Sequence, residues 1–155
     1  MRENGKQLIA SNRRARHDYH LDQDFEAGLV LTGTEVKSLR EGRASLTEAY
    51  ITVDHGEAWL ENAYIPEYLQ GTWTNHSARR KRKLLLHRQE IVRLSTKLKE
   101  SGRTAVPLEL YFLNGKVKLG FALARGKREW DKRQTLRERQ DNREAERAMA
   151  RYRRR

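Results

Sequence analysis

The chain has 155 residues and is strongly basic, with 33 lysines and arginines against 21 aspartates and glutamates and a net charge of +12. It contains no cysteine, which excludes a disulfide framework, a thiol nucleophile and a cysteine-ligated zinc site. No apolar run approaches the ~18 residues of a membrane-spanning helix, and the amino terminus lacks the apolar core of a signal peptide. We therefore expect one cytosolic domain with an anionic partner, nucleic acid before an anionic membrane.

The beginning of the chain is predicted to be a loose arm followed by strand. Residues 1–12 have no sustained periodicity. From Tyr19 to Leu31 apolar side chains fall largely on alternate positions, apart from a polar interruption at 22–24. A period of two is typical of a strand, and the interruption predicts either two short strands or one bent strand.

A short helix is predicted over residues 32–42. Thr32 and Glu35 have the spacing of a capping box, in which each side chain accepts from the other residue's amide, and Gly42 can end the helix. This role explains the carboxylate of Glu35. Glu26, in the preceding strand, has no comparable local role that the sequence reveals.

The middle of the chain is predicted to hold a hairpin and a longer helical region. Two apolar alternations at 50–53 and 58–65, separated by a four-residue loop, favour the hairpin. Residues 77–101 are helical in character, and His87 with Glu90 again has capping-box spacing. This region is therefore either one helix or two helices that meet at His87. Its apolar face would consist of Leu84, Ile91, Leu94 and Leu98.

The strongest local signal is VPLELYFLNGKVKLGFALA, at residues 106–124. Alternating residues lead into and out of Asn114 and Gly115, a pair that tolerates positive φ at both centres of a type I′ turn, so a hairpin is predicted. The order of strands, short helix, strands, longer helix and hairpin predicts a mainly β body over residues 13–126. We expect an antiparallel, OB-fold-like barrel of about six strands with two or three helices, which would bind nucleic acid on an open face.

Residues 127–155 are predicted to form a basic tail. Residues 125–155 hold 13 lysines and arginines against 6 acids, a net charge of +7, whereas residues 1–124 have a net charge of +5. The tail has few apolar residues, but helix formers dominate and Pro and Gly are absent. On a helix, arginines at four-residue steps from Arg139 to Arg155 would repel one another. We therefore predict a tail that is disordered when free and helical along RNA, as on the ribosome.

Enzyme motifs are absent: the sequence has no phosphate-binding P-loop, no GxGxxG, no GxSxG and no HExxH. The one candidate for a general base or a metal site is the cluster at residues 17–20, His-Asp-Tyr-His. On a strand these side chains would alternate between two faces, which divides the site. We expect no catalytic residue, no metal site and no cofactor, and a structural or RNA-contacting role for the cluster.

Four segments resemble the SsrA-binding protein family, also called small protein B. They are NRRARHDY (12–19), FEAGLVLTGTEVKSLR (25–40), RKRKLLLHRQEI (80–91) and GKREWDKR (126–133). The resemblance implies a non-enzymatic RNA-binding protein of trans-translation, the rescue of stalled bacterial ribosomes. The body would bind the tRNA-like domain of transfer-messenger RNA (tmRNA, or SsrA RNA), and the tail would enter the decoding centre and empty mRNA channel of the small subunit. Elongation factor Tu is a further candidate partner, no membrane is expected, and the protein is expected to be a monomer.

The resemblance implies that Asn12, His17, Glu26, Leu85 and His87 bind tmRNA. The alternative for Leu85 is simple core packing, and some relatives carry Asn at the position of His87. Neighbouring cations are expected to contact phosphates, which position an RNA without reading its sequence, or else to form a solvated basic face. These cations are Arg13, Arg14, Arg16, Arg79, Arg80, Lys81, Arg82 and Lys83.

The tail residues are implied to contact the ribosome. Trp130 stands at a position where the family can place His. A tryptophan ring can still stack on a base, but it cannot carry the charge of a protonated imidazole. The alternatives are a lid on the barrel for Trp130 and an exposed position without function for Met149, which otherwise would anchor a tail helix. The predicted tail residues are Lys127, Arg128, Trp130, Asp131, Lys132, Arg133, Arg139, Arg143, Arg147, Met149 and Arg151.

Two other functions stay open at this point. A structural ribosomal or ribosome-assembly protein with a barrel body and basic extension fits the composition, and an RNA-processing enzyme that uses His17 is a third reading. The two glutamates are expected to differ in role. A carboxylate at Glu26 can accept from base amino or imino groups, so its loss should cost RNA binding, whereas loss of Glu35 should cost stability.

Overall fold

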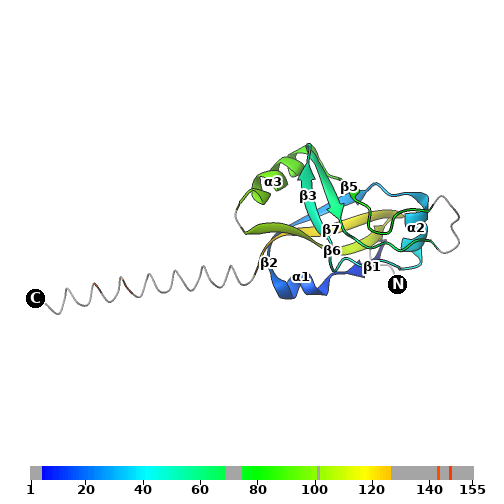
Figure 1. The fold of residues 1–155 in the computed structure, drawn as a ribbon, viewed down its shortest axis with the longest axis horizontal. Helices are drawn as coiled ribbons and strands as arrows, with labels where there is room; N and C mark the ends of the chain where they lie inside the picture. The colour runs from blue at the N-terminus through cyan, green and yellow to red at the C-terminus, as the bar shows by residue number, and fades with distance from the viewer. Residues whose placement is uncertain (1–4, 69–74, 101, 127–142, 144–146, 148–155) are drawn as a thin grey trace, which may run out of the picture.

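The computed structural model describes residues 5–68, 75–100, 102–126, 143 and 147. Within residues 5–126 it shows a mainly β fold with seven strands and three helices (Figure 1). The strands are β1 (Lys6–Ser11), β2 (Tyr19–Leu29), β3 (Tyr50–Asp54), β4 (Glu57–Glu61), β5 (Arg82–Leu85), β6 (Arg103–Leu113) and β7 (Lys116–Gly126). The helices are α1 (Arg13–Asp18), α2 (Gly33–Arg40) and α3 (Arg88–Leu98).

The strands form one antiparallel sheet in the order β1-β6-β7-β2-β5-β4-β3. This sheet is open, so the prediction of a barrel is wrong in that respect. The reason is β1, which occupies the outer edge of β6 between Glu109 and Leu113. β3 lies against β6, but no ladder joins them in the described residues. Residues 6–11, which were expected to be part of a loose arm, are instead the strand that takes this edge.

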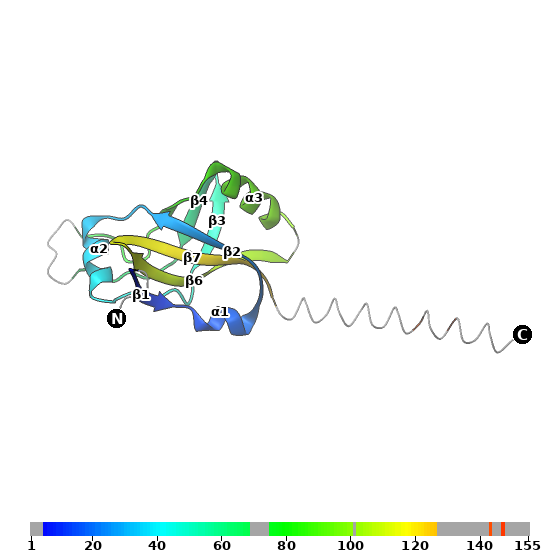
Figure 2. The same ribbon diagram turned by 180° about the vertical axis from the view of Figure 1, so that it is seen from behind.

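The core lies on one face of the curved sheet. Phe25 of β2 and Phe121 of β7 stack there with ring centroids 5.1 Å apart. Leu39 of α2 and Leu94 of α3 are both buried in the same cluster. α1 lies on a different side, where Ala15 packs in a second, smaller cluster (Figure 2). The helices thus cover the sheet from several sides and leave part of its outer face open.

The predictions that rest on short-range chemistry are confirmed. Asn114 and Gly115 turn the β6–β7 hairpin with φ of 50° and 83°. The β3–β4 hairpin also forms, but it turns on only two residues, His55 and Gly56, both with positive φ. β2 is one strand with a register shift next to Asp22, which is the bend that the polar interruption predicted.

Two segments have a different secondary structure from the predicted one. His17 and Asp18 end helix α1, and only Tyr19 and His20 of the 17–20 cluster lie in β2, so the expected strand alternation is wrong. Helix α3 starts after His87, which confirms a break there, but residues 82–85 form β5 and are not helical. A run of three leucines fits both a helical and an extended face, and its sequence alone does not decide between them.

Candidate nucleic-acid interface

An outer face of the sheet holds several of the predicted site residues. Residues that pair across neighbouring strands project to the same side. Chain neighbours of this set, such as Leu84 and Phe121, are buried in the core, so the set itself points away from the core. Its members, from β5 to β6, are Leu85, Gly28, Glu26, Lys118, Gly120 and Tyr111. We call this set the outer face.

Glu26 is exposed on the outer face, and its carboxylate accepts a hydrogen bond from the hydroxyl of Tyr111. The tyrosine ring crosses β7 at Gly120, where a Cβ atom would lie 3.7 Å from ring atom Cε1. Burial, together with the hydrogen bond and charge of Glu26, raises the pKa of Tyr111 above its ordinary value, so the hydroxyl remains a donor. This partner, 85 residues away along the chain, was not predicted from the sequence.

A hollow of about 460 Å³ opens beside Glu26. Arg16 of α1 lines it together with Lys6 and Glu109, which pair with each other at 3.0 Å. α1 is seated here because Ala15 is buried. The fold thus brings Arg16 and Glu26, two predicted RNA-binding residues, to one surface.

Asn12 and His17 lie at the two ends of α1 in very different surroundings. Asn12 is buried, and its side-chain amide donates to the carbonyls of Pro107 at 3.0 Å and Leu46 at 3.4 Å. It therefore holds the start of α1 against β6. His17 is exposed and lies 3.1 Å from Asp18. Of the two, only His17 offers its side chain to a partner in this conformation.

Leu85 and His87 both lie exposed where β5 leads into α3. Leu85 is 53% exposed, which rules out the core-packing alternative. Its neighbour on the outer face is Gly28, where a Cβ atom would approach Leu85 to 3.4 Å. His87 precedes α3, and its backbone amide donates a hydrogen bond to the Glu90 carboxylate at 3.2 Å. The imidazole of His87 thus remains at the surface.

The basic run 79–83 is engaged within the protein, contrary to the expectation of free phosphate contacts. Arg82 is fully buried and has no surface to offer a phosphate, so the prediction is wrong for this residue. Arg80 binds Glu35 through Nε at 3.1 Å. The other pairs are Arg79 with Glu48 at 3.4 Å, Lys81 with Asp54 at 3.8 Å and Lys83 with Glu57 at 3.4 Å.

Glu35 is the centre of a buried ionic cluster. The predicted capping box is present, since the Thr32 amide donates to Glu35 at 2.9 Å. Arg80 binds one carboxylate oxygen and Arg82 the other. Arg82 also donates to the carbonyl of Ala63 at 2.8 Å. Burial would raise the pKa of Glu35, but hydrogen bonds from Arg80, Thr32 and Arg82 outweigh it and hold the pKa below its ordinary value. The cluster therefore ties α2 to β5.

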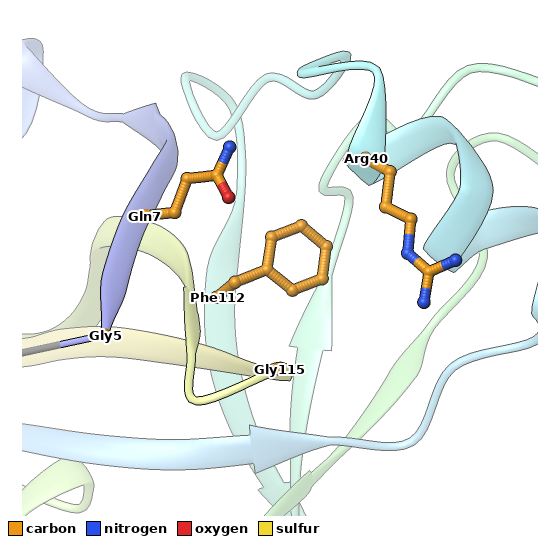
Figure 3. Close-up of a pocket in the computed structure, with 5 residues that line it drawn as sticks. All are labelled: Gly5, Gln7, Arg40, Phe112 and Gly115. Atoms are coloured by element: carbon orange, nitrogen blue, oxygen red, sulfur yellow. The ribbon is translucent and has the colours of Figure 1, made fainter. Parts of the chain in front are cut away.

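A smaller hollow of about 210 Å³ lies at the β6–β7 turn and contains none of the predicted site residues. Figure 3 shows Gln7 of β1, Phe112 of β6 and Arg40 of α2 around it. The side chain of Arg40 makes no hydrogen bond or ion pair with any described residue. The end of α2 thus carries a cation that no described residue neutralises.

Most of the predicted tail contacts lie outside the described residues. Arg143 and Arg147 are described, and both are helical and exposed. None of the described helices has the length and apolar composition needed to cross a membrane. The described residues also contain no group of His, Asp and Glu suited to a metal ion. The tail residues outside the described set are Lys127, Arg128, Trp130, Asp131, Lys132, Arg133, Arg139, Met149 and Arg151.

Comparison with known proteins gives consistent matches over nearly the whole chain. The family model described as SmpB protein matches residues 9–151. An SsrA-binding protein of Clavibacter michiganensis subsp. michiganensis is 63% identical over 153 residues, which cover 99% of this chain and 97% of the relative. One of Streptomyces coelicolor is 64% identical over 149 residues, which cover 96% and 94%. A chain from the solved structure described as "tmRNA-SmpB: a journey to the center of the bacterial ribosome" is 50% identical with a TM-score of 0.65, covering 76% of this chain and 83% of that one.

Proposed function

The chain belongs to the SmpB protein family, and from this we propose that it is an SsrA-binding protein that acts with tmRNA on the ribosome in trans-translation. It is an RNA-binding protein and not an enzyme. The body comprises residues 6–126, because β1 joins the sheet. It holds the tRNA-like domain of the RNA. The tail, residues 127–155, enters the decoding centre and the empty mRNA channel of a stalled ribosome. The protein works as a cytoplasmic monomer, and elongation factor Tu is a further candidate partner.

The outer face is the observation that supports this binding mode best. It presents an exposed carboxylate acceptor, Glu26, and an exposed apolar side chain, Leu85, on one open sheet surface. Exposed arginines, including Arg16 in the Glu26 hollow, flank that surface on α1. RNA with unpaired bases is recognised by this combination, since acceptors read base edges and cations hold the backbone.

Co-purification tests the proposed function against the structural ribosomal alternative. The tagged full-length chain, expressed in its native cells, should recover one abundant tRNA-like RNA in molar excess over ribosomal RNA. Sequencing and quantification of the bound RNA measure this ratio. Stoichiometric recovery with one mature ribosomal subunit from unstressed cells would support a structural ribosomal protein instead.

Replacing Glu26 by Gln should weaken binding of the tRNA-like RNA by about tenfold, because a charged acceptor is lost from the interface. Stability should change by less than about 1 kcal/mol, because the Gln oxygen can still accept from Tyr111. Fluorescence anisotropy and urea unfolding measure the two effects. Asp24→Asn is the matched control, since Asp24 is also exposed and lines the same hollow. An equal loss of affinity in this control would show that general charge, and not Glu26, matters.

A further inference from the structure

Helix α3 carries an apolar side chain, Val92, that the fold leaves uncovered. Val92 is 57% exposed, the largest exposed fraction among the large apolar side chains of the described residues. A β-branched residue in the interior of a helix loses side-chain freedom, and at an exposed position no burial offsets that loss. The stability of α3 therefore gives no reason for a valine here, whereas a partner that covers the side chain would give one.

Val92 lies in a groove of about 370 Å³ between α3 and the β3–β4 hairpin, which we call the α3 groove. α3 lies beside β3 (Figure 1). Val53 of β3 and the turn residues His55 and Gly56 form one wall of the groove. The other wall is a stripe along α3 whose members are three or four positions apart and therefore follow one another along one side of the helix. The stripe consists of Arg88, Val92, Ser95, Thr96 and Lys99.

The α3 groove has a cation at each end and, among the described residues, no carboxylate in its lining. The side chains of Arg88 and Lys99 make no hydrogen bond, ion pair or ring contact with any described residue. Glu100, which follows Lys99 in the chain, is already paired with Lys97 at 3.5 Å and with Arg103 at 3.0 Å. The two ends of the stripe are about 16 Å apart along the helix, or three turns. Both cations are therefore available to a partner that spans this length.

The lining favours one class of occupant. A second copy of the chain and the basic tail both carry a net positive charge, so the two cations would repel them. RNA would bring phosphates, but its unpaired bases stack on rings, and the floor consists of the aliphatic side chains of Val53, Ile91 and Val92. The one ring among the described lining residues belongs to His55, which lies 2.9 Å from Asp54. A protein segment with apolar residues between acids matches both the floor and the ends.

We propose that the α3 groove binds an acidic amphipathic helix of a protein partner. Apolar side chains of that helix cover Ile91 and Val92, and a carboxylate near each of its ends pairs with Arg88 or Lys99. An amphipathic helix presents apolar residues at three- and four-residue steps, which match the steps of the stripe on α3. The groove shares no residue with the outer face or with the hollow beside Glu26. The inference therefore does not depend on how the body binds RNA, and it adds a protein-binding surface to the proposed function.

The first test uses a synthetic amphipathic helix as the probe. This peptide carries leucines on one face and a glutamate at each end of that face, about three turns apart. Fluorescence anisotropy measures its affinity for the full-length chain. Arg88→Gln/Lys99→Gln should weaken binding about tenfold, because both ion pairs with the peptide are lost. Arg93→Gln/Lys97→Gln is the matched control, since it removes the same charge from the same helix outside the groove, and it should weaken binding less than about threefold.

Two further changes separate the apolar floor from the charged ends. Val92→Thr keeps the branched shape and a similar helix propensity, so it should leave the fold intact. It should nevertheless weaken peptide binding several-fold, because a hydroxyl replaces a methyl group beneath the apolar face of the peptide. A probe with glutamine in place of each glutamate should bind the unmodified chain about tenfold more weakly, as the acidic probe does with Arg88→Gln/Lys99→Gln.

A cross-link tests the natural occupant. A photoreactive phenylalanine analogue at Thr96, in the full-length chain expressed in its native cells, should cross-link to a protein segment that holds apolar residues between acids. Mass spectrometry of the joined peptides reads the sequence of that segment. The cross-link should disappear with Arg88→Gln/Lys99→Gln and persist with Arg93→Gln/Lys97→Gln.

Several outcomes would overturn the proposal. Equal losses of peptide affinity in the two double variants would show that only net charge matters, and an unchanged affinity in Val92→Thr would show that the floor makes no contact. A cross-link from Thr96 to RNA or to a basic protein segment would exclude an acidic helix. A greater loss of affinity for the tRNA-like RNA in Arg88→Gln/Lys99→Gln than in the matched control would assign the groove to RNA instead.

Discussion

Replacing Glu35 by Gln is expected to lower the free energy of unfolding by about 3–5 kcal/mol, because it removes one partner of a buried ion pair. Arg82 would keep its positive charge at a site without solvent exposure. Its bond to the Ala63 carbonyl would remain, but no negative charge would offset the cost of its burial. Urea unfolding of the full-length chain measures the loss. Because α2 and β5 are joined through this cluster, we expect one cooperative transition at lower urea.

Glu48→Gln is the matched control for Glu35. Glu48 also pairs with an arginine of the basic run, Arg79 at 3.4 Å, but 69% of its side chain is exposed. An exposed pair is worth roughly 0–1 kcal/mol, so this variant should unfold almost like the unmodified chain. Equal losses of unfolding free energy in the two variants would show that burial of the Glu35 cluster does not increase its contribution to stability.

Lowering the pH should remove the stabilisation that ionised Glu35 provides in the unmodified chain. The pKa of Glu35 is held below its ordinary value in the folded state. Its contribution to stability is therefore fully present above the unfolded pKa of about 4.3 and is lost as the pH falls through the lower, folded value. The Glu35→Gln variant lacks this carboxylate, so its stability should fall less steeply below about pH 4.3. Parallel pH profiles for the two proteins would contradict the assignment.

Removing residues 127–155 should abolish the rescue of stalled ribosomes while leaving the affinity for the tRNA-like RNA within about threefold. The predicted RNA-binding side chains lie on the body, and screening limits the reach of tail charges to about 8 Å at physiological salt. A purified translation system stalled on an mRNA without a stop codon measures rescue as release of tagged peptide. Anisotropy with the tRNA-like RNA measures the affinity.

A shuffled tail separates charge from sequence in this experiment. It keeps the composition of residues 127–155 and therefore all their charges, but it breaks the four-residue spacing of the arginines. We expect it to fail in rescue, because the proposed ribosome contacts depend on particular residues such as Trp130. Full rescue by the shuffled tail would show that the tail acts through its charge and not through particular residues. A large loss of RNA affinity on deletion would place the interface in the tail and not on the outer face.

The features that were predicted correctly depend on residues close together in sequence. Asn114 and Gly115 turn a hairpin because both tolerate positive φ, whatever surrounds them. Thr32 with Glu35 and His87 with Glu90 start helices because a capping box needs only four consecutive residues. The family resemblance, carried by four segments between residues 12 and 133, was likewise present in the residues themselves and implied the function.

The misassigned elements are those that depend on packing partners far away in the sequence. β5 is a strand because β2 and β4 lie on either side of it, although its leucines also fit a helix. β1 is held by the edge of β6, about a hundred residues later. α1 presents little apolar surface, and its Ala15 is buried only because β6 and β7 lie beneath it. No local pattern carries this information, because each segment gains its hydrogen bonds or burial only when the sheet assembles.

By itself the sequence determined the turns, the caps, the family and the strong preference for an anionic partner. Only the tertiary structure decided which charges are available to that partner. Glu35 meets Arg80 and Arg82 across 45 and 47 residues, and Glu26 meets Tyr111 across 85. The basic run thereby becomes internal support, while the side chain of Lys118 on the outer face has no ion-pair partner among the described residues. Charge is a property of composition, but neutralisation within a protein requires a distance of a few ångströms, and the order of the strands sets that distance.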